Sequence, residues 1–475
     1  MLLSSHSRFF SLPIYPKTHY FSTLRSTTAS AAEKFYARLQ ENHGNVEKIL
    51  ASVNGKLDST CIREVLHRCS QNQSSLGIRF FVWACVQSNY RQSAYMYSKA
   101  CELLKIKQNP GVLFDVIEAY KVEKCLVSVK TFKVVLNLCK EANFANEAMW
   151  VLRKMPEFNI RADTTAYNVV IRLFCEKGDM DMAEKLMGEM GLVDLFPDMI
   201  TFVSMIKGFC TVGRLEDACR LFKVMREYGC LPNAVAYSTL LEGVCRFGSL
   251  ERALELLGEM EKEGGNCSPN VITYTSVIQS FCERGKTMEA LGILDRMEAC
   301  GCAPNRVTVG TLIKGLSAEG LFEEAYKLID RLVAVGSVSA GDCYSSLVLS
   351  LIANRRLIEA EKLFRKMLVS GIKPDSLACS IMIKEVCLEG RVRDGFYLYE
   401  ETEKMGFLSS IDSDIYSILL VGLCQQGHSV EAEKLARLMV EKGIQLKAPY
   451  TNRIVENLKK FGDKELVIQL ANSGR

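Results

Sequence analysis

The chain repeats one residue pattern every 35 residues, and this period constrains its fold more than any other feature. Residues 164–198, 199–233 and 271–305 align without a gap, so that aromatic, Cys, Gly, Ala, Met and Pro residues fall in the same columns. A fixed period of roughly 20–50 residues is typical of stacked-repeat solenoids, in which each unit packs on its neighbours. A chain of 475 residues exceeds one ordinary hydrophobic core, and a solenoid is not bound by that limit.

The columns of one repeat describe a helical hairpin. When the closing Pro-Asp or Pro-Asn pair is placed in columns 34 and 35, column 4 is aromatic and columns 7, 8 and 11 are mostly apolar, which makes one stripe of a helix. Glycine in column 15 can end this helix with a positive φ. The second helix carries Ala in column 20, which permits close packing, and usually Met in column 27, which suits a core. The sequence therefore predicts an all-α fold, an alpha-alpha superhelix (a solenoid of helical hairpins) with a continuous inner groove.

The repeats and the composition divide the chain into five regions. We predict an organellar transit peptide at residues 1–32, a helical leader at 33–93, a degenerate repeat at 94–128, nine repeats at 129–447 and a partial repeat or cap at 448–475. Residues 1–32 contain eleven Ser or Thr residues, two arginines, one lysine and no Asp or Glu, which is typical of an import signal. A mitochondrial location is the first expectation and a chloroplast the alternative, and an ordinary disordered tail is the simpler interpretation.

Cysteine is abundant, but its spacing argues against disulfides and metal binding. Of the 19 cysteines, six occupy one column of successive repeats: Cys175, Cys210, Cys245, Cys282, Cys387 and Cys424. We interpret them as small thiols in a helix-packing column, in a protein of a reducing compartment. No CxxC pair occurs, so we expect no metal site. No apolar run is long enough to span a bilayer, so we expect no membrane insertion.

Several enzyme classes leave no trace in the sequence. There is no HxE with a downstream CxxC, no GxxxxGK[ST] loop and no GxGxxG in a βαβ context. We therefore predict a protein that is not an enzyme, with no catalytic residues and no cofactor. The net charge of +4 is partly carried by the first 32 residues, so overall charge does not indicate nucleic-acid binding.

The period and its columns resemble the pentatricopeptide repeat family, in particular its plant-type P class of pure 35-residue repeats. The resemblance covers about residues 94–475 and rests on the Tyr–x–x–x–Ile/Leu first helix, the Gly, Ala and Met columns, and the Gly–x–x–Pro–Asp/Asn close. Residues 58–97 look like the pre-repeat helices of this family, with Phe80, Phe81 and Trp83 in its FFxWA box. Tetratricopeptide repeats differ in having a period of about 34 residues and a Trp–x–x–Leu–Gly pattern.

The resemblance implies single-stranded RNA binding in an organelle, one base per repeat, with column 5 and the closing column selecting the base. The implied base-selecting residues are Asn168, Asp198, Asn233, Ser238, Asn270, Thr275, Asn305, Ser345, Asp375, Ser380, Asp412 and Ser417. By resemblance, Asn with Asp selects U, Ser or Thr with Asn selects A, and Ser with Asp selects G, which gives ?-U-?-A-A-?-G-G-?. Four pairs depart from this pattern: Lys133–Asp163, Val203–Asn233, Gly310–Ala340 and Ser417–Lys447.

Two further columns complete the implied interface. Column 2 would sandwich the bases, with Thr165, Ile200, Val235, Ile272, Val307 and Leu377. Column 9 lies on the same helix face as column 5, and possible phosphate contacts there are Arg172, Lys207, Lys314 and Lys384. Asp342 and Asp414 interrupt column 2, and their carboxylates should weaken the binding of a polyanion in the C-terminal half.

Each of these columns also has a structural interpretation. A closing Asp or Asn before a helix is a natural N-cap worth roughly 1 kcal/mol, and column 9 cations can be ordinary solvated charges. Column 5 discriminates better, because six of its nine residues are Asn, Ser or Thr, which are mediocre helix formers.

The leading hypothesis is sequence-selective binding of single-stranded organellar RNA, in support of stabilisation, splicing, processing or translation of specific transcripts. The alternative is a protein-interaction scaffold, such as a mitoribosome-associated repeat protein. Expected partners are therefore RNA and either other RNA-processing factors or the mitoribosome, and we expect a monomer.

Overall fold

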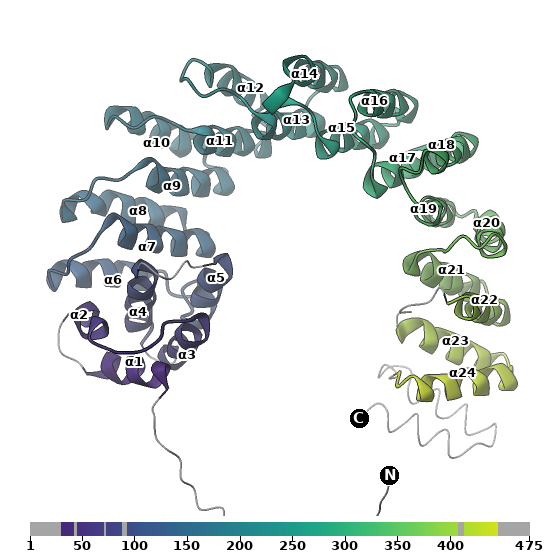
Figure 1. Ribbon diagram of the computed structural model, residues 1–475, viewed down its shortest axis with the longest axis horizontal. Helices are drawn as coiled ribbons and strands as arrows, with labels where there is room; N and C mark the ends of the chain where they lie inside the picture. The colour runs from purple at the N-terminus through teal and green to yellow at the C-terminus, as the bar shows by residue number, and fades with distance from the viewer. Residues whose placement is uncertain (1–29, 42–44, 71–72, 88–92, 407–412, 445–475) are drawn as a thin grey trace, which may run out of the picture. The chain divides into compact units, whose positions relative to one another are not determined.

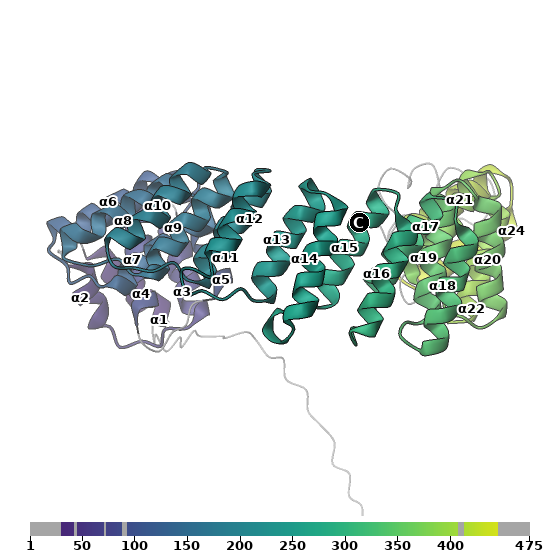
Figure 2. The same ribbon diagram turned by 90° about the horizontal axis from the view of Figure 1, so that it is seen from above.

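A computed structural model describes residues 30–41, 45–70, 73–87, 93–406 and 413–444 (Figures 1 and 2). The chain forms two compact units, residues 1–173 and 174–475, and the division falls inside helix α9 (Thr164–Lys177). The described residues contain helices and no strand, which confirms the all-α prediction. None of the described helices combines the length and the apolar character needed to cross a bilayer.

The first unit contains the leader helices and the first hairpins. Its helices are α1 (Ala31–Gln40), α2 (Val46–Ala51), α3 (Ser59–Cys69), α4 (Ser74–Val86), α5 (Ala94–Leu103), α6 (Gly111–Val122), α7 (Val129–Ala142), α8 (Ala145–Lys154), the 3-10 helix η1 (Met155–Phe158) and the first part of α9. Helix α1 begins at Ala31, inside the predicted transit peptide, because Ser30 and Glu33 form a capping box there. Phe35 of α1 then packs against Phe80 and Trp83 of the predicted FFxWA box.

The second unit is a row of helical hairpins. After the end of α9 it contains α10 (Met180–Leu192), α11 (Met199–Thr211), α12 (Leu215–Val224), α13 (Ala234–Phe247), α14 (Leu250–Glu263), the 3-10 helix η2 (Gly265–Cys267), α15 (Val271–Glu283), α16 (Thr287–Ala299), α17 (Arg306–Ala318), α18 (Phe322–Val335), α19 (Ala340–Ala353), α20 (Leu357–Val369), α21 (Ser376–Leu388), α22 (Val392–Lys404), α23 (Ser413–Gln425) and α24 (Ser429–Glu441). The odd-numbered first helices pack on one another from α11 to α23, and Figure 1 shows them as one layer with the even-numbered helices as the other. This is the predicted solenoid of hairpins.

The predicted packing columns form the core. The column-20 residues are all fully buried: Ala183, Ala218, Ala253, Ala290, Ala325, Ala360 and Ala432. The column-27 methionines are buried as well: Met155, Met190, Met225, Met260, Met297, Met367 and Met439. Burial of such a side chain stabilises the fold by about 1.5–3 kcal/mol, so the Met column serves packing, as predicted.

The cysteine column has a specific packing partner in the next repeat. A Cβ atom added at Gly243 would lie 2.2 Å from the Cys210 sulfur, and one at Gly208 would lie 2.8 Å from the Cys175 Cβ atom. Column 10 of one repeat therefore packs directly on the thiol in column 12 of the repeat before it. Burial raises the pKa of Cys210 to about 12 and, with the nearby Glu176 charge, that of Cys175 to about 12. These thiols stay protonated and act as small apolar groups.

One glycine of column 15 departs from the predicted positive φ. Gly178 and Gly320 have φ of +84° and +76°, but Gly248 has φ of −96°. A Cβ atom at Gly248 would lie 2.8 Å from the Val244 carbonyl oxygen and 3.0 Å from Leu215. Glycine is needed at this position for space rather than for a left-handed backbone.

Candidate nucleic-acid interface

The column-2 residues form a row of exposed side chains along the first helices. Aliphatic side chains in this column are between 55% and 72% exposed: Ile200, Val235, Ile272, Val307 and Leu377. Thr165 is exposed too. In the second unit, each of the five aliphatic residues follows the N-cap of its helix by two positions, so the helix register brings these five to the same layer. Because apolar side chains usually turn inward, an exposed aliphatic residue repeated in one column indicates a surface that meets a ligand.

The closing residues cap the next helix, as the structural interpretation predicted. Asp198, Asn233, Asn270, Asn305 and Asp375 are the N-caps of α11, α13, α15, α17 and α21. In each case a side-chain oxygen accepts a backbone N–H of the first turn.

In two central units, a threonine side chain links the column-5 hydroxyl to the side chain of the closing residue. The Ser238 hydroxyl lies 3.0 Å from the Thr273 hydroxyl, which donates to the Asn270 Oδ1 atom. The next unit repeats this geometry, with 2.7 Å between the Thr275 and Thr308 hydroxyls and a bond from Thr308 to Asn305. Asn270 and Asn305 are both exposed.

Thr273 and Thr308 are residues that the sequence reasoning missed. Both are almost fully buried, and each joins the column-5 hydroxyl of one repeat to the closing Asn that caps its own helix. The signal was available, because Thr recurs in column 3 at Thr131, Thr201, Thr273 and Thr308, three residues after the cap. They position the two predicted base-selecting groups relative to each other.

The earlier pairs vary. Asn168 is 6% exposed, within the first unit, and Asp198 caps α11 within the second. In the pair that departs from the pattern, Val203 offers no polar group, and the Asn233 Oδ1 atom accepts the N–H groups of Val235 and Ala236.

Two of the off-pattern pairs have plain structural reasons. Lys133 makes an ion pair of 2.5 Å with Asp163, so the column-5 and closing residues bind each other. Gly310 and Ala340 have no polar side-chain group, and the cap of α19 is the preceding Ser339. Neither pair therefore presents amide or hydroxyl groups to a base in the way that the central units do.

The unit of residues 341–375 is closed by contacts within the protein. Ser345 is fully buried, and its hydroxyl accepts the Asp375 N–H group at 2.9 Å. The Asp375 Oδ1 atom caps α21 at Ala378, and the Oδ2 atom lies 2.6 Å from a guanidinium nitrogen of Arg306.

The last two units are only partly described. Ser380 is half-buried in α21, and Ser417 is fully buried in α23. Asp412 and Lys447 lie outside the described residues, as do residues 1–29 of the predicted transit peptide and the whole predicted cap at 448–475.

The column-9 cations are on the surface. Arg172, Lys207, Lys314 and Lys384 are all exposed, which suits both a phosphate contact and a solvated charge. Lys207 and Arg246, together with Glu242, line a hollow of about 170 Å³ between α11 and α13.

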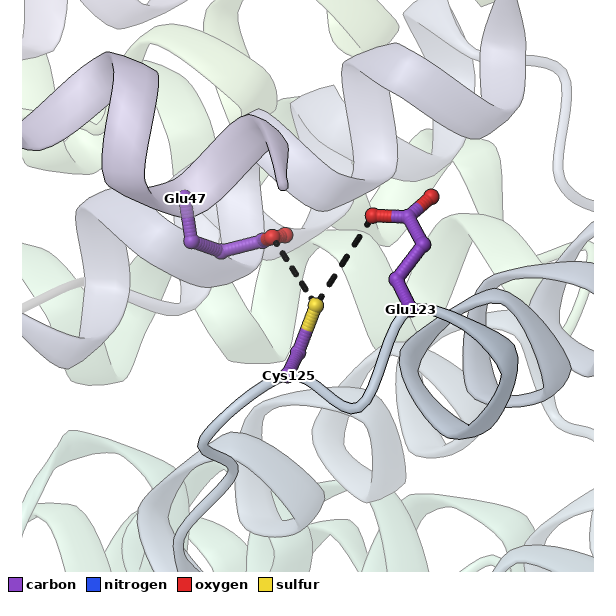
Figure 3. Close-up of side chains that lie close together, drawn as sticks. All are labelled: Glu47, Glu123 and Cys125. Carbon is purple, nitrogen blue, oxygen red and sulfur yellow. Dashed lines mark hydrogen bonds between the residues drawn. The ribbon is translucent and has the colours of Figure 1, made fainter. Parts of the chain in front are cut away.

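Elsewhere, in the first unit, Glu47, Glu123 and Cys125 form the one group among the described residues that has metal-ligand geometry (Figure 3). The guanidinium of Arg79 already supplies the positive charge, with nitrogen–oxygen distances of 2.6 Å to Glu47 and 2.7 Å to Glu123. Burial, followed by the charge of Glu47, raises the pKa of Cys125 to about 12, so its thiol is a poor ligand. The cluster is an ion-pair core for an arginine rather than a metal centre.

Comparison with known proteins identifies the repeats. The PPR repeat family matches residues 162–211, 197–246, 232–283 and 269–318, and the PPR repeat matches residues 307–337, 342–372 and 414–444. The pentatricopeptide repeat-containing protein At5g47360 of Arabidopsis thaliana is 53% identical over 444 residues, which is 93% of each chain. A second Arabidopsis protein of this kind, At1g77360, mitochondrial, is 26% identical over 159 residues, 31% of this chain and 30% of its own.

A solved structure shows the same fold. The crystal structure of the pentatricopeptide repeat protein PPR10 from maize superposes with a TM-score of 0.58 at 20% identity, over 93% of this chain and 65% of that chain. At this identity the likeness concerns the path of the backbone, and the side chains of the interface have to be judged on their own geometry.

Proposed function

Because the chain belongs to the pentatricopeptide repeat family, we propose that it binds single-stranded RNA along the first helices of its repeats, with selectivity for base sequence. The observation that carries this proposal is the row of exposed column-2 aliphatic side chains beside the Ser238–Asn270 and Thr275–Asn305 pairs. Unpaired bases can stack on apolar side chains, and their Watson–Crick edges can bond to hydroxyl and amide groups.

The central units supply the chemistry for this. The Asn305 Oδ1 atom is used by the helix cap, so its amide nitrogen is the group that can donate to a base. The Thr275 hydroxyl, held by Thr308 and the Val271 carbonyl, is fixed next to it. A donor and a hydroxyl in fixed positions suit adenine, whose edge presents both an acceptor and an amino group.

We place this activity in an organelle, with a mitochondrion first and a chloroplast second, from the composition of residues 1–32. The mitochondrial Arabidopsis relative adds modest support. Within the organelle, the bound protein would support stabilisation, splicing, processing or translation of a transcript, because bases held by the protein are protected from nucleases and stay single-stranded. We further propose that the protein is not an enzyme and acts as a monomer on RNA.

The test is binding of the full chain to the RNA N-U-N-A-A-N-G-G-N at several salt concentrations. We expect binding that weakens with salt, since phosphate contacts release counterions. Replacing Thr275 with Asn and Asn305 with Asp should shift the preferred base at that unit from A to U. An unchanged preference would exclude base reading by this pair. The matched control is the single variant Thr311→Val, which changes a hydroxyl of the helix that Asn305 caps but no residue of column 5 or of the closing column.

A protein-interaction scaffold is the second candidate, favoured by the Lys133–Asp163 pair, whose base-selecting groups bind each other. Absence of RNA affinity near physiological salt, with retained capture of a mitoribosomal or RNA-processing partner, would favour it.

A further inference from the structure

Arg306 reaches from its own repeat into the next one. It is the first residue of α17, and its guanidinium reaches Asp342 in the first turn of α19 and Asp375 at the start of α21. The nitrogen–oxygen distances are 3.3 Å to the Asp342 Oδ1 atom and 2.6 Å to the Asp375 Oδ2 atom. These three helices lie next to one another in the layer of first helices (Figure 1).

The two carboxylates belong to the same repeat. Asp342 stands in column 2 of the unit 341–375, where five other repeats have an exposed aliphatic residue, and Asp375 is its closing residue. A base read by this unit would need both places. The Arg306 side chain contacts both, and 59% of it remains exposed to solvent.

The residues in columns 2, 5 and 35 of this unit all have partners within the protein. Asp342 accepts from Ser339 through its second oxygen, Asp375 uses its second oxygen to cap α21, and the buried Ser345 hydroxyl accepts the Asp375 N–H group. In the unit that ends in Asn305, by contrast, the closing residue is exposed, and its side chain is a neutral amide that does not attract an arginine.

We propose that Arg306, Asp342 and Asp375 form a latch that closes the unit 341–375 in the RNA-free protein, so that Arg306 determines whether this unit reads a base. The inference rests on the proposed RNA binding and deepens it by naming a specificity-determining residue outside the reading columns. Phosphate groups compete with carboxylates for a guanidinium, so RNA that engages the neighbouring units can open the latch by drawing Arg306 away.

While the latch is closed, the Ser345–Asp375 pair contributes little to selectivity, although its residues are those that the family resemblance assigns to G. An exposed arginine–carboxylate pair is weak and is screened by salt. The expected effect on base preference is therefore modest, up to about fivefold. It should disappear at high salt, where the open and the latched unit become equivalent.

The experiment measures a ratio of affinities, which separates base reading from overall charge. The full chain is titrated with N-U-N-A-A-N-X-G-N, where X is each of the four bases. We expect the unmodified chain to prefer X = G only slightly. The variant Arg306→Ala should bind all four RNAs more weakly, because two carboxylates are left unpaired, and should raise the preference for G over U by up to about fivefold.

Arg331→Ala is the matched control, since Arg331 is also partly exposed and pairs with Asp295 on second helices away from this face. Its G preference should equal that of the unmodified chain. An unchanged ratio in Arg306→Ala, with RNA still bound, would overturn the latch and leave the proposed function standing. Failure of the unmodified chain to bind any of the four RNAs at low salt would overturn the proposed function itself.

Discussion

Arg79 in the first unit and Arg306 in the second each join two carboxylates, but in opposite surroundings. Arg79 is 3% exposed, binds Glu47 and Glu123 through paired nitrogens, and lies 5.3 Å over the Tyr120 ring. Arg306 has one nitrogen on each of two aspartates and a side chain that is mostly exposed. The same chemistry therefore appears both inside the protein and on the predicted RNA-binding face.

Burial decides what such a cluster can do. Inside the first unit, removing one partner leaves charges that water can solvate only in part, so the Arg79 cluster fixes α2, α4 and the end of α6 together. On the surface, water and salt replace the partners at small cost, so the Arg306 cluster can open and close. The first arrangement suits a structural clamp, and the second suits a switch.

Arg79→Met should give the largest effect. The variant keeps an unbranched apolar stem but removes the guanidinium, which leaves Glu47 and Glu123 without their partner. We expect a loss of about 3 kcal/mol in the unfolding free energy of the first unit, at the low end for a buried pair because both carboxylates are partly exposed. Amide hydrogen exchange in α4 and α6 is the measurement, with the exposed Arg63→Met as control. Equal protection in both variants would contradict a structural clamp.

These clusters also mark the limit of what the sequence predicts. The repeats and their columns predicted the hairpins, the Ala and Met core and the cysteine packing, because each depends on a period that the sequence displays. Arg79 binds Glu47 and Glu123 over separations of 32 and 44 residues in the part of the chain that does not repeat. No column marks such a contact.

The sequence predicted which columns form the candidate site, but it did not predict which side chains contact one another there. Column 2 is exposed and the closing residues cap helices, and both follow from helix register. Ser345 shares its column with Thr275 but is fully buried, and Arg306 reaches Asp375 over 69 residues. Side-chain partners across three helices depend on packing detail that no single repeat encodes.

Acidification should separate the buried cluster from the rest of the first unit. The hydrogen bonds that Arg79 donates to Glu123 lower the pKa of that carboxyl below its ordinary value of 4.5. A group with a depressed folded pKa stabilises the fold fully above its unfolded pKa, and the contribution is lost as the pH falls through the folded value.

As the pH is lowered past about 4.5, the unmodified chain should therefore lose unfolding free energy. Its loss should exceed that of Arg79→Met by roughly 1 kcal/mol, because the variant has already lost the pair. Denaturant unfolding at a series of pH values measures this difference. Parallel pH profiles for the two proteins would show that Arg79 does not lower the pKa of Glu123.

The smallest effect is expected for Arg306→Gln on stability. An exposed ion pair contributes about 0.2–1 kcal/mol at low salt, and at about 1 M salt the screening length of about 3 Å removes most of it. Thermal unfolding of the second unit should thus differ little between the variant and the unmodified chain, and the difference should vanish with salt, as for Arg331→Gln.

The Arg79→Met effect should persist at the same salt concentration, since solvent ions do not reach the Glu47 and Glu123 carboxylates as freely. A loss above about 2 kcal/mol in Arg306→Gln would place Arg306 with Arg79 as a structural clamp, because a residue that holds the fold so firmly could not be released by RNA.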